Sequence, residues 1–209
     1  MTLILMQQKG QICVYMKMNK RSYIILLIAL VIPGLLPAPA LPPGGNSFLL
    51  LETMRTEVIR KDKAQYLLKY NRFKKTLAKY ESSNNWKEYN RFGFIGKYQF
   101  GPSALQTTGY GHVTLESFKM NPGIFPEQEQ ENAMDMLLRS NETAMRKSIN
   151  KFVGFLMLDS IRITRQGILA AAHLAGPANV KEFLESFGQK NVRDRMGTHI
   201  SDYFYLFSR

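Results

Sequence analysis

The sequence predicts a mainly α-helical protein, and three observations support this fold class. The run from Phe48 to about Tyr80 contains no proline or glycine and repeats apolar residues at helical spacing. Two later segments, near Pro126 and Thr164, combine helix start signals with apolar faces. No stretch of the folded part alternates apolar and polar residues over a convincing length, so we expect at most a small β-hairpin around residues 92–100.

The first predicted helix, residues 48–80, carries two kinds of side chain. One set is apolar and recurs at helical spacing: Leu51, Met54, Val58, Tyr70, Phe73, Leu77 and Tyr80. The other set is basic and lies between them: Arg55, Arg60, Lys61, Lys63, Lys69, Arg72, Lys74, Lys75 and Lys79. We interpret the basic set as the hydrated face of a helix that packs on the core. The alternative is attraction to a polyanion, such as wall polymer or wall-peptide carboxylates.

Turn and cap signals organise the middle of the chain. A short helix begins at Pro102, because proline suits the first helical position, and residues 112–124 are rich in loop signals. Acidic residues follow Pro126 and favour the start of a helix that reaches about Asn150. The mostly apolar segment 152–161 either loops over the core or forms a short helix.

The next predicted helix, residues 166–174, is apolar all round, so we expect it to be central and buried. Thr164 can cap its start, and Gly176 with Pro177 is expected to end it. A further short helix is expected at residues 180–187.

The composition is that of an ordinary globular protein with an excess of positive charge. Of 209 residues, 45% are hydrophobic and 21% are charged, and the formal net charge is +12. The single cysteine, Cys13, cannot form an intramolecular disulfide. The three histidines, His112, His173 and His199, are far apart with no thiol nearby, so we expect no metal site and no cofactor.

The N-terminal region is typical of an export signal. Lys20 and Arg21 precede the apolar run 23–36, and residues 37–40, Pro-Ala-Pro-Ala, provide a small-residue cleavage site. The apolar run is shorter than the roughly 20 residues that a membrane-spanning helix needs. We therefore predict a cleaved signal, and the alternative is an uncleaved anchor.

These signals define the predicted domain boundaries. Residues 1–40 form a signal peptide with an upstream extension, residues 41–47 form a Pro/Gly linker, and residues 48–209 form the folded domain. We expect export to the periplasm or cell envelope, with membrane contact only through the transient signal segment. Export also disfavours nucleic acid as the partner of the basic chain.

The stretch from Tyr80 to Gly101 contains the candidate catalytic residue. Glu81 is followed by serines and asparagines, then by Trp86 and a loop with glycine hinges. A carboxyl group, amides and aromatic faces are the groups with which proteins bind and cleave carbohydrate. Glu81 ends the first predicted helix on the stripe of Leu77, so we expect its carboxyl to face inward, where desolvation would raise its pKa. The competing Glu88 is interpreted as a hydrated surface residue.

Two later residues are candidates for the same site. His173 is a polar residue on an otherwise apolar helix, and we expect its side chain to face the cleft near Glu81. The alternative is a structural histidine bonded to a backbone carbonyl. Tyr203 lies on the last predicted helix, residues 199–207, for which Thr198 is the expected cap.

Three ordered motifs resemble those of the lytic transglycosylases. Glu81-Ser82 and the later Gly96-Lys97-Tyr98-Gln99 are similar to the family's Glu-Ser pair and Gly-x-x-Gln element. Residues 163–174 resemble the family's middle element, and residues 171–176 resemble its Ala-x-Tyr-Asn-x-Gly motif, with His173 in the tyrosine position. Residues 194–203 resemble a late element that ends in Ser-Asp-Tyr. The resemblance covers about residues 77–207.

The resemblance implies a lysozyme-like α fold of the transglycosylase (SLT) type, bacterial peptidoglycan as substrate, and Glu81 acting as acid and then as base. It implies substrate-binding or orienting roles for Ser82, Tyr98, Gln99, His173 and Tyr203. The chain departs from the family at His173-Leu174, where Tyr-Asn is commoner, and at Ser83, where related chains often have glycine.

The predicted reaction is cleavage of the β-1,4 bond between N-acetylmuramic acid and N-acetylglucosamine by a monomer. No second carboxylate is obvious near Glu81 in the sequence, which favours attack by the muramic O6 and a 1,6-anhydro product. A lysozyme-type hydrolase using water is the nearest alternative. A non-catalytic peptidoglycan-binding module is the second, although a decayed enzyme would be expected to lose Glu81.

Overall fold

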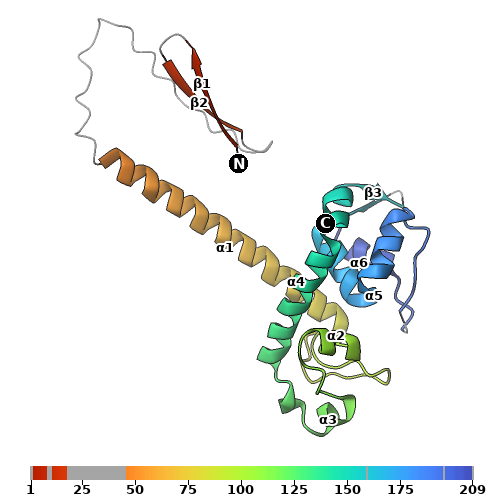
Figure 1. The fold of residues 1–209 in the computed structure, drawn as a ribbon. Coiled ribbons are helices and arrows are strands. Elements are labelled where there is room, and N and C mark those ends of the chain that lie inside the picture. The colour runs from red at the N-terminus through yellow and green to blue at the C-terminus, as the bar shows by residue number, and fades with distance from the viewer. Residues whose placement is uncertain (1, 9–10, 18–45, 159, 195, 209) are drawn as a thin grey trace, which may run out of the picture. The chain divides into compact units, whose positions relative to one another are not determined.

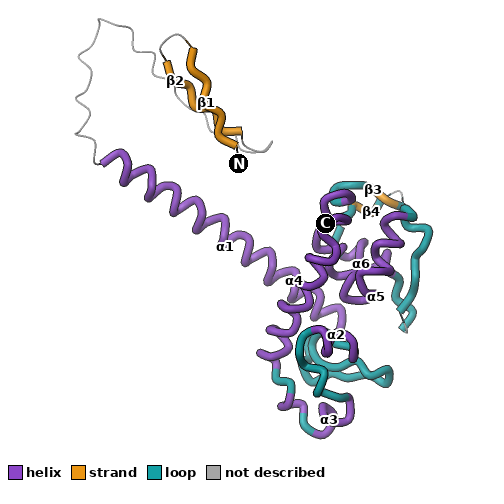
Figure 2. The backbone as a smooth tube through the Cα atoms, viewed as in Figure 1, coloured by secondary structure: helices purple, strands orange, loops and turns teal. Residues whose placement is uncertain are grey.

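The structure is a computed structural model that describes residues 2–8, 11–17, 46–158, 160–194 and 196–208. Helices dominate it, which confirms the predicted mainly α fold class (Figure 2). The chain divides into two units, residues 1–53 and 54–209. The predicted signal segment, from Met18 to Ala40, lies outside the described residues. Among the helices that are described, none is both long and apolar enough to cross a bilayer.

The first unit contains an antiparallel hairpin that the sequence does not predict. Strand β1, Thr2–Gln8, pairs with strand β2, Gln11–Lys17. The register runs from Thr2 opposite Lys17 to Gln8 opposite Gln11. The apolar residues of β1 are consecutive, without the alternation that marks a half-buried strand, so periodicity does not reveal it.

Helix α1, Asn46–Ser82, is the long helix expected from residue 48 onward, and it extends past Glu81. Its second half packs into the core of the second unit through Phe73, Leu77 and Ala78, all of which are buried. The first half does not pack in this way. The expectation that its apolar stripe faces a core is wrong, because three side chains on it are 71%, 61% and 57% exposed: Leu51, Met54 and Val58.

Three other helices build the core around the second half of α1: α4, Glu127–Phe152, α5, Arg165–Glu185, and α6, Ile200–Leu206. Figure 1 shows α3 near the beginning of α4 and the pair α5–α6 beside its later part. The residues of α5 from Ile168 to Ala172 are all buried, as the apolar sequence predicts. Thr164 caps α5 by accepting a hydrogen bond from the Gly167 amide, which confirms that prediction.

One of two predicted helix boundaries is confirmed and the other is wrong. Gly176 has the non-helical angles φ 79° and ψ 154°, so the range of α5 contains two helical segments that meet at a kink before Pro177, as predicted, and the second segment reaches Glu185. Thr198 does not cap α6. The cap residue is His199, whose amide donates to the Asp202 carboxylate, while the Thr198 amide donates to Asp194.

The segment between α1 and α4 forms a smaller, loop-rich lobe (Figure 2). It contains α2, Pro102–Thr107, which begins at the predicted proline, then α3, Leu115–Met120, and the 3₁₀ turn η1, Pro122–Ile124. Helix α3 was expected to be loop. It forms because Thr114 caps it and Phe118 anchors it in the core.

The predicted hairpin is in the wrong place. Around residues 92–100 only isolated bridges occur, one joining Tyr89 to Ile95 and one joining Ile95 to Phe100. The small antiparallel pair of the second unit is β3, Leu156–Met157, with β4, Ile161–Arg162. It occupies the segment that was expected to be a loop or a short helix.

Candidate active site

Glu81 is the penultimate residue of α1, one helical turn after Leu77. Its side chain is only 13% exposed, as its place on the Leu77 stripe predicts. Burial raises the pKa of its carboxyl above the ordinary value. His173 and a hydrogen bond from Tyr203 oppose that rise, whereas the charge of Asp194 adds to it. A carboxyl that retains its proton above the usual pH range is suited to act as a general acid.

Tyr203 reaches Glu81 from α6. Its hydroxyl donates a hydrogen bond to Oε1 of Glu81, and its side chain is almost fully buried. Its ring meets Tyr80 edge to face, with ring centroids 5.2 Å apart. Burial and the neighbouring Glu81 charge raise the pKa of the Tyr203 hydroxyl, so it keeps its proton and acts as the donor.

His173 lies beside the same carboxyl, as expected, but it is also bonded to a backbone carbonyl. Its Nε2 is 2.7 Å from the Tyr98 carbonyl oxygen and 3.8 Å from Oε1 of Glu81. Because a carbonyl oxygen only accepts, Nε2 carries the proton. The His173 side chain is 4% exposed, and its buried Nδ1 has no hydrogen-bond partner among the described residues. The position of His173 thus combines the features of both predicted alternatives. It lies near Glu81, and it is bonded to a backbone carbonyl.

Ser82 and Tyr98 contribute to the site through the main chain of the loop. The Ser82 hydroxyl donates to the Lys97 carbonyl oxygen at 2.7 Å, which joins the end of α1 to the loop. The Tyr98 ring is buried, and its hydroxyl donates to Glu131 at 2.9 Å. The link from Tyr98 to Glu81 is its main-chain carbonyl, which accepts a hydrogen bond from His173. Ser82 thus orients a neighbour of Glu81 with its hydroxyl, and Tyr98 does so with its main-chain carbonyl.

Gln99 is held within its own loop. Its amide nitrogen donates to the Gly96 carbonyl at 2.9 Å, and its amide oxygen accepts from Asn90 at 3.0 Å. Its φ of 49° is in the left-handed region, which a non-glycine residue rarely adopts. Such a conformation at a candidate site indicates that the surrounding hydrogen bonds determine the loop conformation.

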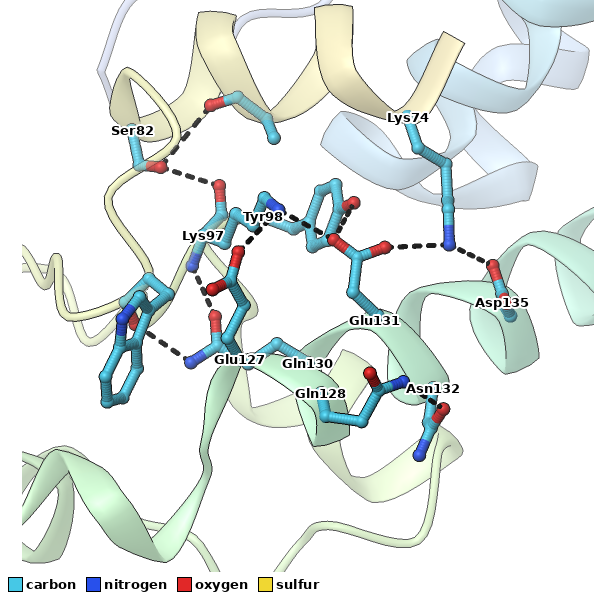
Figure 3. Close-up of polar contacts among 12 residues, drawn as sticks. Lys74, Ser82, Lys97, Tyr98, Glu127, Gln128, Gln130, Glu131, Asn132 and Asp135 are labelled. Atoms are coloured by element: carbon cyan, nitrogen blue, oxygen red, sulfur yellow. Dashed lines mark hydrogen bonds and ion pairs between the residues drawn. The ribbon is translucent and has the colours of Figure 1, made fainter. Parts of the chain in front are cut away.

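A network of charged side chains joins the loop 96–99 to α4 and α1 (Figure 3). The sequence does not predict this network. The Glu131 carboxylate accepts from Lys97 at 2.8 Å and pairs with Lys74 at 2.8 Å. Lys74 also pairs with Asp135 at 2.6 Å, and Lys97 with Glu127 at 2.9 Å. The interpretation of Lys74 as a hydrated surface residue is wrong, because it is buried within this network.

The electrostatics of Glu131 differ from those of Glu81. Burial alone would raise its pKa, but hydrogen bonds from Lys74, Lys97 and Tyr98 outweigh burial and hold the pKa below its ordinary value. The pKa of Glu131 is thus shifted down, whereas the pKa of Glu81 is shifted up. The lowered pKa suits Glu131 to a structural role in ion pairs, and the raised pKa suits Glu81 to the role of candidate acid.

A buried amide completes the support of the loop. Gln130 accepts from the Lys97 amide at 2.6 Å and donates to the carbonyls of Trp86 and Phe125. A Cβ on Gly96 would lie 2.5 Å from the Gln130 amide oxygen, and Gly96 has φ +77°. Glycine is therefore required at the first position of the Gly-Lys-Tyr-Gln element for two independent reasons.

Two cavities are found among the described residues, and neither is lined by the candidate acid. A cavity of about 770 Å³ lies in the smaller lobe, against Phe92, Leu105 and Glu116. A second cavity of about 460 Å³ runs along α1 against Lys75, Asn84 and Tyr98. Glu81 lines neither of them. Within the described part of the chain, the charge of Asp194 also raises the pKa of Glu81, and its Oδ1 accepts hydrogen bonds from the amides of Met196 and Thr198.

Comparisons with known proteins give no match that would assign this arrangement. No family model matches the chain, and no curated protein and no solved structure is significantly similar to it. The site is therefore interpreted from its own geometry.

Proposed function

We propose that this chain is a peptidoglycan-cleaving glycosidase of the lytic transglycosylase type, built on a lysozyme-like helical domain. The observation that carries the proposal is the setting of Glu81. A carboxyl at the end of a buried helical turn has a raised pKa, a tyrosine donor and a histidine 3.8 Å away. The three motifs in the sequence support it, because their residues meet at this carboxyl although they are far apart in the chain.

The proposed reaction uses one carboxyl twice. Protonated Glu81 gives its proton to the glycosidic oxygen between N-acetylmuramic acid and N-acetylglucosamine, and the bond from that oxygen to the muramic C1 breaks. The muramic O6 then forms a bond to C1, and its proton passes to the Glu81 carboxylate. The glutamate is restored, and the product is a 1,6-anhydro sugar.

The neighbours of Glu81 have defined tasks in this scheme. Tyr203 stabilises the carboxylate that is left after the first proton transfer, because its hydroxyl already donates to Oε1. The Nε2–H of His173 lies 3.8 Å from the same oxygen and fixes the Tyr98 carbonyl beside it. Ser82 and Gln99 keep the loop in the conformation that places these groups.

The substrate proposal includes a location. Peptidoglycan glycan strands are found in the cell envelope, and the predicted export signal would deliver the domain as a monomer to the periplasm or cell envelope. A non-catalytic binding module is a weaker reading of the same site, because binding alone has no use for a buried carboxyl with a raised pKa.

A hydrolase is the second candidate, and Asp194 is the observation that favours it. Its charge reaches Glu81, and a second carboxylate is what a water-using glycosidase needs. Because Asp194 also holds its own loop, Asp194→Asn keeps the amide contacts of one oxygen but removes the charge. A hydrolase dependent on Asp194 would lose about 10²-fold or more in turnover, whereas an enzyme that uses O6 attack would retain most of its activity.

The test is mass spectrometry of the muropeptides that the purified domain releases from sacculi. We expect 1,6-anhydro products, which are one water lighter than the reducing products of a hydrolase. In Glu81→Gln the release should fall by roughly 10²–10⁴-fold, because a carboxamide cannot deliver a proton. Glu88→Gln is the matched control on an exposed glutamate. Near-normal release by a folded Glu81→Gln protein would contradict the proposal.

A further inference from the structure

The cavity along α1 has a composition that the proposed reaction at Glu81 does not use. It measures about 460 Å³, and its lining combines three lysines with two asparagines (Asn71, Lys74, Lys75, Asn84 and Lys97). Figure 3 shows its inner wall, where Lys74 and Lys97 flank Tyr98 and Glu131. A hollow of this size is within the range of small-molecule and peptide sites.

The lysines of this cavity differ in whether their charge is neutralised. Lys74 and Lys97 are paired with Glu131, Asp135 and Glu127, so their charges are already balanced. Lys75 is exposed, and within the described part of the chain its ammonium group has no hydrogen bond or ion pair. The cavity therefore presents one uncompensated positive charge.

The asparagines provide neutral hydrogen-bonding groups around that charge. The side-chain amides of Asn71 and Asn84 make no hydrogen bond to any other described residue. Asn71 lies one turn before Lys75 on α1, and Asn84 lies just beyond the end of the helix. Each amide can both donate to a carbonyl and accept from an amide, which is the pattern that an extended peptide requires.

The cavity is also close to the candidate acid. Asn84 follows Glu81 by three residues, and its backbone N–H donates a hydrogen bond to the Ala78 carbonyl oxygen in the last turn of α1. Tyr98 belongs to both places, since it is one of the lining residues of the cavity and its carbonyl oxygen bonds to His173 beside Glu81. A group attached to a sugar at Glu81 needs to extend only past this segment to enter the cavity.

We propose that this cavity binds the peptide attached to the muramic acid, with Lys75 pairing with a peptide carboxylate and the two asparagines binding peptide amides. This inference rests on the proposed function, because it assumes a muramic sugar at Glu81. A bare glycan fits the cavity less well, since a neutral sugar would leave the Lys75 charge uncompensated and the wall offers it one aromatic side chain, Tyr98, whose hydroxyl is already bonded to Glu131.

The binding experiment uses the full chain carrying Glu81→Gln, which cannot turn its ligand over. Calorimetry compares a purified disaccharide–tetrapeptide with the same disaccharide freed of its peptide. We expect the peptide-bearing ligand to bind about tenfold more tightly. Lys75→Glu should remove that difference, and Asn71→Ala, a helix-compatible change at an exposed position, should reduce it.

The matched control is Lys79→Glu, which reverses the same charge one turn further along α1 but lies outside the cavity lining. It should leave the difference between the two ligands unchanged. Equal affinity for the two ligands, no measurable binding of either, or equal losses in Lys75→Glu and Lys79→Glu would each overturn the peptide site. Equal losses would indicate unspecific attraction to the basic helix.

A second experiment measures turnover and distinguishes a failure of the peptide site from a failure of the proposed function. The protein with Glu81 intact is given whole sacculi and peptide-free glycan strands, and the release of products is measured. If neither is cleaved, the proposed function fails, while the calorimetry still decides whether the cavity takes the peptide. If both are cleaved, Lys75→Glu should lower kcat/KM on sacculi about tenfold and leave the peptide-free strands unaffected.

Discussion

Glu81 and Tyr203 form the contact on which the chemistry of the site depends, and its effect on pH dependence has a defined sign. The tyrosine hydroxyl donates to the carboxylate and lowers the pKa that burial has raised. The reacting form is the protonated acid, so activity is lost as the pH rises through the pKa of Glu81. In Tyr203→Phe the pKa rises further, and we expect the alkaline limb of the pH–rate profile to move to higher pH.

The control for this prediction lies on the same helix. Tyr205 is 58% exposed, so Tyr205→Phe removes a hydroxyl without touching the site. Its profile should match that of the unchanged protein. An alkaline limb that stays in place in Tyr203→Phe, or moves to lower pH, would show that the hydroxyl does not stabilise the ionised form of Glu81.

Ser83, the first residue after α1, has a measurable conformational cost. Its φ is 56°, in the left-handed region, where a side chain is strained and glycine is not. The left-handed conformation costs roughly 1–2 kcal/mol for an L-residue, and glycine would remove that cost. The greater conformational freedom of glycine in the unfolded chain offsets part of the resulting stabilisation. We expect Ser83→Gly to raise the free energy of unfolding by about 0.5–1 kcal/mol in urea denaturation.

A serine in ordinary helical conformation provides the contrast. Ser103 is an exposed residue of α2, and Ser103→Gly should lower the free energy of unfolding by roughly 0.5 kcal/mol. The prediction is that the free energy of unfolding rises in Ser83→Gly and falls in Ser103→Gly. Destabilisation of similar size at both positions would mean that Ser83 carries no conformational strain.

At the scale of elements, α4 links the loop 96–99 to α1 through the Glu131 carboxylate, which contacts both Lys97 and Lys74. Glu131→Gln keeps the shape but leaves Lys74 and Lys97 without a shared partner, and breaking a buried pair in this way is costly. Glu131 is 25% exposed, which reduces the effect, so we expect a loss of about 2 kcal/mol in the free energy of unfolding. Turnover should fall as well, because the carbonyls that orient Ser82 and His173 belong to this loop.

The pH dependence of this stabilisation follows from the lowered pKa of Glu131. A carboxyl whose folded pKa is depressed stabilises the fold above its unfolded pKa, and the stabilisation is lost as the pH falls through the folded pKa. The stability difference between the unchanged protein and Glu131→Gln should therefore be full at neutral pH and vanish in acid. Gln128→Ala, on the exposed side of α4, is the control, and a difference that persists at low pH would contradict the ionic account.

Much of the helical framework is predictable from sequence because its signals are local. The acidic first turn of α4, the Thr164 cap of α5 and the proline that begins α2 all act within one turn of the chain. Helix α3 is missed because its cap pairs Thr114 with Ser117 in place of the commoner glutamate or glutamine. The hairpin at residues 156–162 is missed because strands of two residues have no period.

The rest of the fold and the site depend on tertiary contacts. Leu51 and Phe73 have the same helical spacing, and only the presence or absence of a packing partner makes one exposed and the other buried. Glu81, His173 and Tyr203 are predictable because each belongs to a motif. The pairing of Lys74 with Glu131 joins two helices far apart in sequence and leaves no local pattern. The sequence therefore predicts only a hydrated basic face for Lys74 and an acidic first helical turn for the segment of Glu131.

At the scale of the whole molecule, the two units lead to a truncation experiment. Residues 1–53 belong to a unit separate from residues 54–209, and the next turns of α1 have exposed apolar side chains. We expect a protein of residues 54–209 to keep its melting temperature within a few degrees and to keep its activity on sacculi. A truncation at Phe73 should fail to fold, since that residue is in the core. Loss of activity in the shorter protein with its fold intact would assign the first unit a role in catalysis.

The place of Glu81 in the last turn of α1 has an electrical consequence. The peptide dipoles of a helix leave partial negative charge on the final carbonyls, which disfavours an ionised carboxylate there and so adds to the effect of burial. The effect comes almost wholly from the last turn, and the length of the helix before it contributes little. Shortening α1 from its beginning should therefore leave the proton affinity of Glu81 unchanged. A change that unwinds residues 78–82 should lower that affinity even if every side chain around the carboxyl is kept.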